Sequence, residues 1–237
     1  MEQTMMALPQ LLVVAKQPAA GQTKTRLCPP LTSETAAALY ECFLRDTIEI
    51  MRATPNVGRG IVYLPAAAAA YFRQLAPEFT LTLQVGADLG ARLDHALTAA
   101  LTQGANAAVI MDSDSPTLPA AYLGEAFAHL AAGADVVLGP CDDGGYYLIG
   151  LRQPQPRLLR EVPVSTPTVL RDTLAIAEAL GLRVALLPTW YDVDTGAELQ
   201  RLRRELATTA TDSLASPAQY TRAFLQTEFL QNALSEG

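Results

Sequence analysis

The sequence is poor in cysteine and in basic residues. Its 237 residues include three cysteines and 17 lysines and arginines, and the formal net charge is −7 at pH 7. Three cysteines with no C-x-x-C pair argue against a disulfide framework and against a zinc site, and they favour a reducing compartment. Scarce basic side chains argue against nonspecific nucleic-acid binding, because that binding depends on clustered lysine and arginine meeting phosphates.

Long apolar runs are also missing. The first apolar run, at 11–15, is too short to cross a membrane, and no basic segment followed by a long apolar stretch marks a targeting signal. We therefore expect a cytoplasmic protein without a membrane partner. Half of the residues are hydrophobic, so a chain of this length can bury a large core in a single domain, with at most a modest appendage.

What the sequence does contain is a regular alternation of strand-like and helix-like segments. Apolar runs predict strands at 11–15, 60–64, 81–85, 107–111, 135–138, 147–151 and 183–187. Helices are expected at 33–52, 66–75, 91–103, 120–132, 167–180 (capped by Thr166) and from 195 to about 206. This alternation is typical of a three-layer α/β/α sandwich with a mainly parallel sheet.

The last part of the chain differs in composition. Residues 1–206 carry the alternating pattern, whereas 207–216 is rich in threonine, serine and alanine and is typical of a linker. A final helix is expected to follow Ser216 and Pro217. We therefore place one domain at 1–206, and expect 207–237 to be a linker and a helix that packs on this domain or on a partner subunit of a homodimer.

An acidic pair follows the apolar run at 107–111. Asp112 and Asp114 lie two residues apart at the expected carboxyl end of a buried strand, where ligands bind in open α/β sheets. Two carboxylates there suit Mg²⁺ or Mn²⁺ bound to a phosphorylated substrate. An Asx-type turn before the helix that follows Pro119 is the structural alternative, and on this pair alone it is the stronger one.

The loop after the first strand gathers several of the few cations. It holds Lys16, Lys24 and Arg26, with Gly21 giving access to the backbone. Such a loop at a strand end is suited to receive phosphates, although it matches neither a Walker A loop nor G-x-G-x-x-G. An exposed basic loop is the alternative.

Two further strand ends carry aspartate. Asp143, Gly144 and Gly145 are typical of a tight turn between the strands at 135–138 and 147–151, and such a turn can also place Asp143 beside a substrate. Asp194 precedes the helix that begins near 195. It could belong to a helix cap, or it could supply another carboxylate to the metal.

Six motifs occur in an order that resembles a known family. They are A-K-x-P-x-x-G-x-x-K-T-R-L from position 15, D-L-G-x-R-L from 88, S-D-x-P from 113, G-P-x-x-D-G-G-Y-Y-L-I-G-L from 139, S-T-P from 165 and D-x-D-T from 192. Together they resemble a bacterial family of GT-A-type glycosyltransferases, one branch of which is linked to arsenosugar biosynthesis. That family is similar to the phospholactate and molybdenum-cofactor guanylyltransferases.

The resemblance implies a nucleotide-diphospho-sugar transferase fold and a set of site residues. Nucleotide and phosphates would be bound by Lys16, Gly21, Lys24, Arg26, Asp88, Leu89 and Gly90. The metal would be held by Asp114 and Asp194. The sugar or the acceptor would be bordered by Asp143, Gly144, Gly145, Ser165 and Thr166. The family usually has a small residue at the position of Asp112, so Asp114 is the expected ligand of that pair, and it often has tryptophan at the position of Val164.

The implied activity is metal-dependent transfer of a sugar from a nucleotide-diphospho-sugar to a small acceptor. Asp143 would act near the acceptor as a general base, and Lys24 and Arg26 would assist the departing diphosphate. A nucleotidyltransferase that joins a nucleoside triphosphate to a phosphorylated small molecule and releases pyrophosphate would use the same fold and metal. A nucleotide-binding module without catalysis is the third hypothesis.

Overall fold

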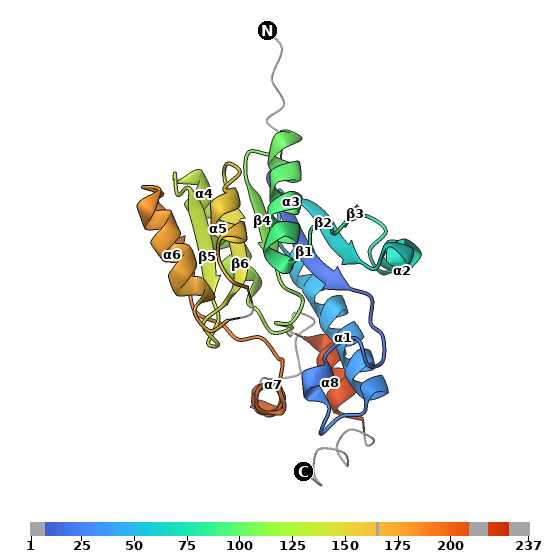
Figure 1. Cartoon of the computed structure of the whole chain (residues 1–237). Helices are drawn as coiled ribbons and strands as arrows, with labels where there is room; N and C mark the ends of the chain where they lie inside the picture. Colours follow the sequence, from blue (N-terminus) through green and yellow to red (C-terminus); the bar gives the residue numbers. More distant parts are fainter. Residues whose placement is uncertain (1–7, 165, 209–217, 228–237) are drawn as a thin grey trace.

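The computed structural model describes residues 8–164, 166–208 and 218–227 (Figure 1). Seven strands form one sheet in the order β3-β2-β1-β4-β6-β5-β7. They are β1 (Gln10–Lys16), β2 (Gly58–Leu64), β3 (Thr80–Leu83), β4 (Ala108–Met111), β5 (Val136–Pro140), β6 (Tyr146–Leu151) and β7 (Val184–Leu186). Only β6 is antiparallel to its neighbours, β4 and β5. All seven strands lie where the apolar runs predict them, and the expected hairpin joins β5 to β6.

Helices cover both faces of the sheet. They are α1 (Ser33–Arg52), α2 (Ala69–Leu75), α3 (Leu89–Thr102), α4 (Ala120–Ala131), α5 (Pro156–Arg160), α6 (Val169–Ala179), α7 (Gly196–Thr208) and α8 (Gln219–Leu225). Apolar side chains of α1, α2, α4, α7 and α8 pack in one core cluster, and those of α3, α5 and α6 in a second cluster on the opposite face. The predicted three-layer α/β/α fold is confirmed.

The start of α6 differs from the sequence prediction. The helix begins at Val169 with Thr168 as its N-cap, and Thr166 does not cap it. The backbone N–H of Leu170 instead donates to the carbonyl of Gly144, 3.0 Å away. A contact with the turn between β5 and β6 thus takes the place of a local cap. The short helix α5 was not predicted, because five residues carry too little periodic signal.

The expected C-terminal helix, α8, packs against α1 of the same chain, and its Leu225 lies in the core. Most of the expected linker lies outside the described residues, and α7 continues to Thr208. A buried carboxylate on α1 fixes the start of α8. Asp46 accepts hydrogen bonds from the backbone N–H groups of Tyr220 and Thr221, at 3.0 and 2.8 Å.

Replacement of Asp46 by alanine is expected to release α8. Asp46 caps the helix from a distance, because no side chain of α8 itself does so. The loss of a cap costs about 1–2 kcal/mol of stability. Hydrogen exchange at Tyr220 and Thr221 should accelerate. In the central strands, exchange should accelerate only by the amount that the lower global stability accounts for. Glu49→Ala, a change at a partly exposed position on the same helix, is the control and should leave exchange in α8 unchanged. Equal acceleration in both variants would contradict the assignment.

No helix in the described part of the chain is both long and apolar enough to cross a membrane.

Candidate functional site

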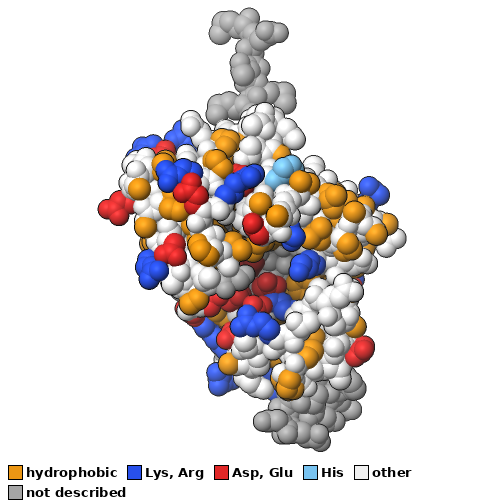
Figure 2. Space-filling model, in the orientation of Figure 1, with side chains coloured by type: hydrophobic (Ala, Val, Ile, Leu, Met, Phe, Trp, Pro, Cys, Tyr) orange, Lys and Arg blue, Asp and Glu red, His pale blue; other side chains and the backbone are white. Residues whose placement is uncertain are grey.

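Two adjoining pockets open at the carboxyl ends of the parallel strands. Their volumes are about 470 and 460 Å³. The first pocket is lined by the loop at 22–26, by the ends of β1 and β4, and by the start of α3. The second is lined by the turn between β5 and β6, by 166–167 and by 192–194. Figure 2 shows acidic side chains gathered with a few basic ones in a hollow on this face.

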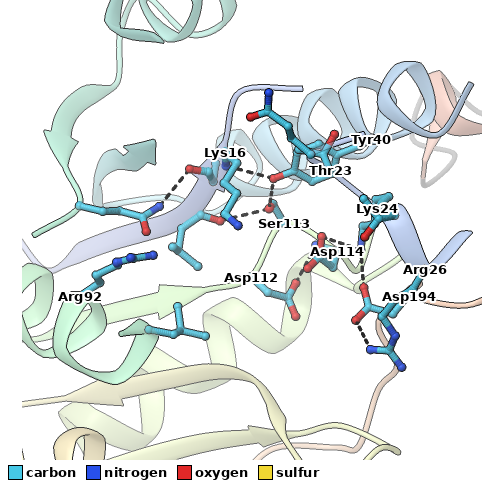
Figure 3. A pocket seen from close by; sticks show the side chains of 16 residues that line it. Lys16, Thr23, Lys24, Arg26, Tyr40, Arg92, Asp112, Ser113, Asp114 and Asp194 are labelled. Atoms are coloured by element: carbon cyan, nitrogen blue, oxygen red, sulfur yellow. Dashed lines mark hydrogen bonds and ion pairs between the residues drawn. The ribbon is translucent and has the colours of Figure 1, made fainter. Parts of the chain in front are cut away.

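A lysine of the first pocket bridges two aspartates that line both pockets. The Nζ of Lys24 lies 2.7 Å from Oδ1 of Asp114 and 2.8 Å from Oδ1 of Asp194 (Figure 3). It also donates to the carbonyl of Val193 at 2.8 Å, so all three ammonium protons are engaged. The backbone N–H of Val193 in turn donates to the carbonyl of Asp114 at 3.0 Å. Residues far apart in the sequence are thereby locked into one unit.

The lysine of this unit is buried, whereas its two carboxylates are partly exposed. The side chain of Lys24 is 4% exposed, whereas Asp114 and Asp194 are each 33% exposed. Burial alone would lower the pKa of Lys24, but the two carboxylates outweigh it and raise that pKa above its ordinary value. The ammonium group therefore stays charged and acts as an internal counter-ion for Asp114 and Asp194.

The backbone at Lys24 is in an unusual conformation. Its φ of 50° and ψ of 38° lie in the left-handed region, which costs a residue other than glycine about 1 kcal/mol or more. A strained backbone of this kind is kept only where surrounding contacts hold it, and it is common at functional sites. Here the three bonds of the ammonium group supply those contacts.

Asp112 has a different role from Asp114. Its Oδ1 accepts the backbone N–H of Asp114 at 3.0 Å, and its Oδ2 accepts the hydroxyl of Ser115 at 3.4 Å. This is the Asx-type turn that the sequence left open. Burial and the charge of Asp114 raise the pKa of Asp112 well above its ordinary value. Both oxygens of Asp112 are used within the turn, so the geometry favours Asp114 as the metal ligand.

The residues expected near the nucleotide divide into two groups. Lys16, Arg26 and Leu89 line the first pocket, and Arg26 also donates to Oδ2 of Asp194 at 3.2 Å. Gly21, Asp88 and Gly90 are not among its lining residues. Asp88 caps α3 by accepting the backbone N–H of Ala91, and a side chain at Gly90 would meet the carbonyl of Leu159. These two residues position Leu89 at the pocket.

The residues expected around the acceptor lie at the second pocket. Asp143, Gly145 and Thr166 line it, and Oδ1 of Asp143 accepts the backbone N–H of Gly145 at 2.8 Å. Gly144 does not line it, but supports the segment at 166–167 from behind. Ser165 lies outside the described residues.

Sequence reasoning missed several lining residues that carry polar or sulfur atoms. Among them are Gln84 and Arg92 in the first pocket, and Cys141 and Asp192 in the second. Gln84 follows β3 and donates to the carbonyls of Ala15 and Val62, both at 3.0 Å. Position in the D-L-G-x-R-L and D-x-D-T motifs could have drawn attention to Arg92 and Asp192. Nothing in the local sequence singles out Gln84 or Cys141.

Comparison with known proteins identifies the family. Residues 47–166, just over half of the chain, match the model of a family described as "Uncharacterized protein conserved in bacteria (DUF2064)". The chain belongs to the DUF2064 family. No curated protein matches the sequence.

Solved structures share the fold of this chain. A "putative nucleotide-diphospho-sugar transferase" from Desulfovibrio desulfuricans G20 is 30% identical, with a TM-score of 0.87 over 98% of both chains. The manganese complex of Rv0371c from Mycobacterium tuberculosis H37Rv is 17% identical, with a TM-score of 0.52 over 83% of this chain and 98% of that one. A CMP:2-keto-3-deoxy-manno-octonic acid synthetase with CTP is 11% identical, with a TM-score of 0.51 over 85% and 99%. The last two show the shared fold alone.

In this DUF2064 member the charges at the pockets suit a bound cation. Five aspartates line the second pocket, at 112, 114, 143, 192 and 194, and Arg26 is its only lining lysine or arginine among the described residues. Asp114 uses one oxygen on Lys24 and keeps the second, whereas Asp194 uses one oxygen on Lys24 and the other on the exposed side chain of Arg26; both carboxylates are one-third exposed. Carboxylate oxygens are the ligands that Mg²⁺ and Mn²⁺ prefer, so the donor set fits such an ion.

Proposed function

We propose that this protein is a cytoplasmic, metal-dependent glycosyltransferase that moves a sugar from a nucleotide-diphospho-sugar to a small acceptor. The observation that carries the proposal is the Lys24–Asp114–Asp194 unit at the junction of two pockets. A donor nucleotide in the first pocket and an acceptor in the second would meet at this junction. The match to the Desulfovibrio protein supports a nucleotide-sugar donor. Membership of the arsenosugar-associated branch stays a prediction.

The first pocket supplies the groups for the donor. Lys16, Arg26 and Arg92 are cations that can bind phosphate oxygens, because none of them is enclosed by carboxylates as Lys24 is. Leu89 offers an exposed apolar side chain on which a base or ribose could pack. A Mg²⁺ or Mn²⁺ ion held by Asp114 and Asp194 would neutralise charge on the diphosphate.

The second pocket supplies the group for the acceptor. One oxygen of Asp143 is fixed by the N–H of Gly145, and the other is available to take a proton from an acceptor hydroxyl. Thr166 and the edge of Tyr146 border the same space. Lys24, with no free proton, acts by holding Asp114 and Asp194 in place.

Nucleotidyl transfer is the second candidate, supported by the likeness to the synthetase bound to CTP. The two reactions differ in what leaves. A glycosyltransferase releases a nucleoside diphosphate from a nucleotide sugar, whereas a nucleotidyltransferase releases pyrophosphate from a triphosphate. Incubation with each donor class and a set of small acceptors, followed by chromatography and a pyrophosphate assay, separates them.

Asp114→Asn tests the proposed metal site. In the wild type, nucleotide sugars should raise the midpoint of thermal unfolding more strongly with Mn²⁺ than without it, because ligands that bind the native state stabilise it. Asp114→Asn should weaken the Mn²⁺-dependent binding by about tenfold or more. Asp142→Asn is the matched control, because Asp142 pairs with Arg201 and lines neither pocket. Equal binding with and without metal would support the module without catalysis instead.

A further inference from the structure

A thiol and two carboxylates meet at the second pocket. Cys141, Asp143 and Asp192 each offer one ligand atom, and these atoms lie within 4.8 Å of one another. In a tetrahedral site with metal–sulfur bonds of about 2.3 Å and metal–oxygen bonds of about 2.0–2.2 Å, ligand atoms lie roughly 3.5 Å apart. Small side-chain rotations therefore suffice to bring the three atoms around one ion.

The backbone holds these residues together independently of any ion. Cys141 and Asp143 belong to the turn between β5 and β6, and Asp192 follows β7. The N–H of Trp190 donates to the carbonyl of Pro140 at 2.9 Å, and the N–H of Asp142 donates to the carbonyl of Trp190 at 3.1 Å. These two hydrogen bonds fix Trp190, two residues before Asp192, against the turn that carries Cys141 and Asp143.

The charges of the two carboxylates are not balanced by the protein. Lys24 and Arg26 pair with Asp114 and Asp194, and Arg201 pairs with Asp142. Among the described residues, no lysine, arginine or histidine forms an ion pair with Asp143 or Asp192. Their carboxylate groups offer oxygens that lie within 4.8 Å of each other, so the two charges repel. A cation at this position would remove the repulsion.

The thiol gives a second, independent indication of a ligand. Cys141 is 7% exposed, and its sulfur makes no hydrogen bond within the described part of the chain. The sulfur lies within 4.8 Å of a carboxylate oxygen of Asp143 and of one of Asp192. A metal ion at this position would replace the proton of the thiol and use all three groups.

We propose that Cys141, Asp143 and Asp192 form a binding site for a thiophilic divalent ion, Zn²⁺ in the first instance, distinct from the oxygen-only site at Asp114 and Asp194. One thiolate and two carboxylates select Zn²⁺ or Co²⁺ over Mg²⁺. Three protein ligands leave a fourth position open toward the second pocket, as in zinc sites that bind small molecules.

The site has a consequence that rests on the proposed function. The carboxylate of Asp143 that would ligate Zn²⁺ is also the group that would accept a proton from the acceptor. Zn²⁺ is therefore expected to inhibit the transfer reaction, while Mg²⁺ or Mn²⁺ supports it.

Co²⁺ titration of the full-length protein tests the site without an activity assay. A sulfur-to-cobalt charge-transfer band in the near ultraviolet should grow to one equivalent, and Zn²⁺ but not excess Mg²⁺ should abolish it. Cys141→Ser should lose the band, and Cys42→Ser, a change on α1 away from the pockets, should keep it. Asp192→Asn should weaken Co²⁺ binding by about tenfold or more. Far-ultraviolet circular dichroism confirms that each variant is folded.

The outcomes of the Co²⁺ titration test this site independently of the proposed function. Absence of the band in the wild type, or its persistence in Cys141→Ser, would overturn the proposal. If Cys141→Ser fails to fold, the Asp192→Asn titration decides, and unchanged affinity there would overturn it. Asp114→Asn should keep the band, so a failed glycosyl-transfer assay leaves this result unaffected.

Discussion

Replacement of Lys24 by methionine is expected to lower the free energy of unfolding by about 3 kcal/mol and to abolish metal-dependent nucleotide binding. Methionine keeps the apolar stem but removes the ammonium group that bridges Asp114 and Asp194. Breaking a buried ion pair by removing one partner costs about 3–5 kcal/mol, and the lower end applies because the two carboxylates are one-third exposed to water. Their mutual repulsion should also separate the two strand ends. Urea unfolding measures the first effect and calorimetric titration the second.

Arg26→Met is the matched control for Lys24→Met. Arg26 binds the same carboxylate of Asp194 at 3.2 Å, but its side chain is 69% exposed. An exposed ion pair is worth about 0–1 kcal/mol, so this variant should retain nearly the full stability. Similar losses in both variants would contradict the role of burial. Tighter Mn²⁺ binding by Lys24→Met would mean that the ammonium group blocks the metal site instead of building it.

Replacement of Gly144 by alanine is expected to lower the free energy of unfolding by about 2–4 kcal/mol. The φ of Gly144 is +91°, where a side chain is strained. A Cβ there would lie 2.1 Å from the carbonyl oxygen of Pro167. Because the obstacle is backbone, the whole segment must move, and the bond from the N–H of Leu170 to the Gly144 carbonyl would break. Urea unfolding measures the loss.

Gly124→Ala makes the same chemical change where neither obstacle exists. Gly124 lies on the exposed side of α4, and a Cβ there would meet nothing within 4 Å. Alanine should stabilise this helix by about 0.5–1 kcal/mol. The two variants should therefore shift the urea midpoint in opposite directions. A neutral Gly144→Ala would show that the turn and the segment at 166–167 are not in firm contact.

The order of strands and helices could be read from local patterns. The apolar run at 107–111 becomes β4, which is buried along its whole length, and the stripe from Ser33 to Arg52 becomes α1 with those bounds. Hydrophobic periodicity succeeds here because each segment buries one face against a large core. It fails for α5, which is only five residues long. It also fails for the start of α6, where a turn distant in sequence determines the local backbone.

Asp114, Asp194 and Lys24 could be selected from the sequence because each follows a predicted strand at the edge where parallel strands end. The ion pairs between these three residues could not be predicted from the sequence. The resemblance placed Lys24 at the phosphates, whereas the folded chain turns its ammonium group onto two carboxylates and a carbonyl. The backbone at Lys24 is left-handed in this arrangement, a conformation that the local sequence does not predict.

By itself, the sequence therefore determined the layers, the strand ends and the residue types that reach them, because periodicity and chain order are local properties. Only the tertiary structure decided which charges pair, that Asp112 closes a turn while Asp114 faces Lys24, and that Cys141 meets Asp143 and Asp192. These contacts join loops up to 170 residues apart. Their geometry is set by strand order and backbone hydrogen bonds between loops, which no single segment of the sequence encodes.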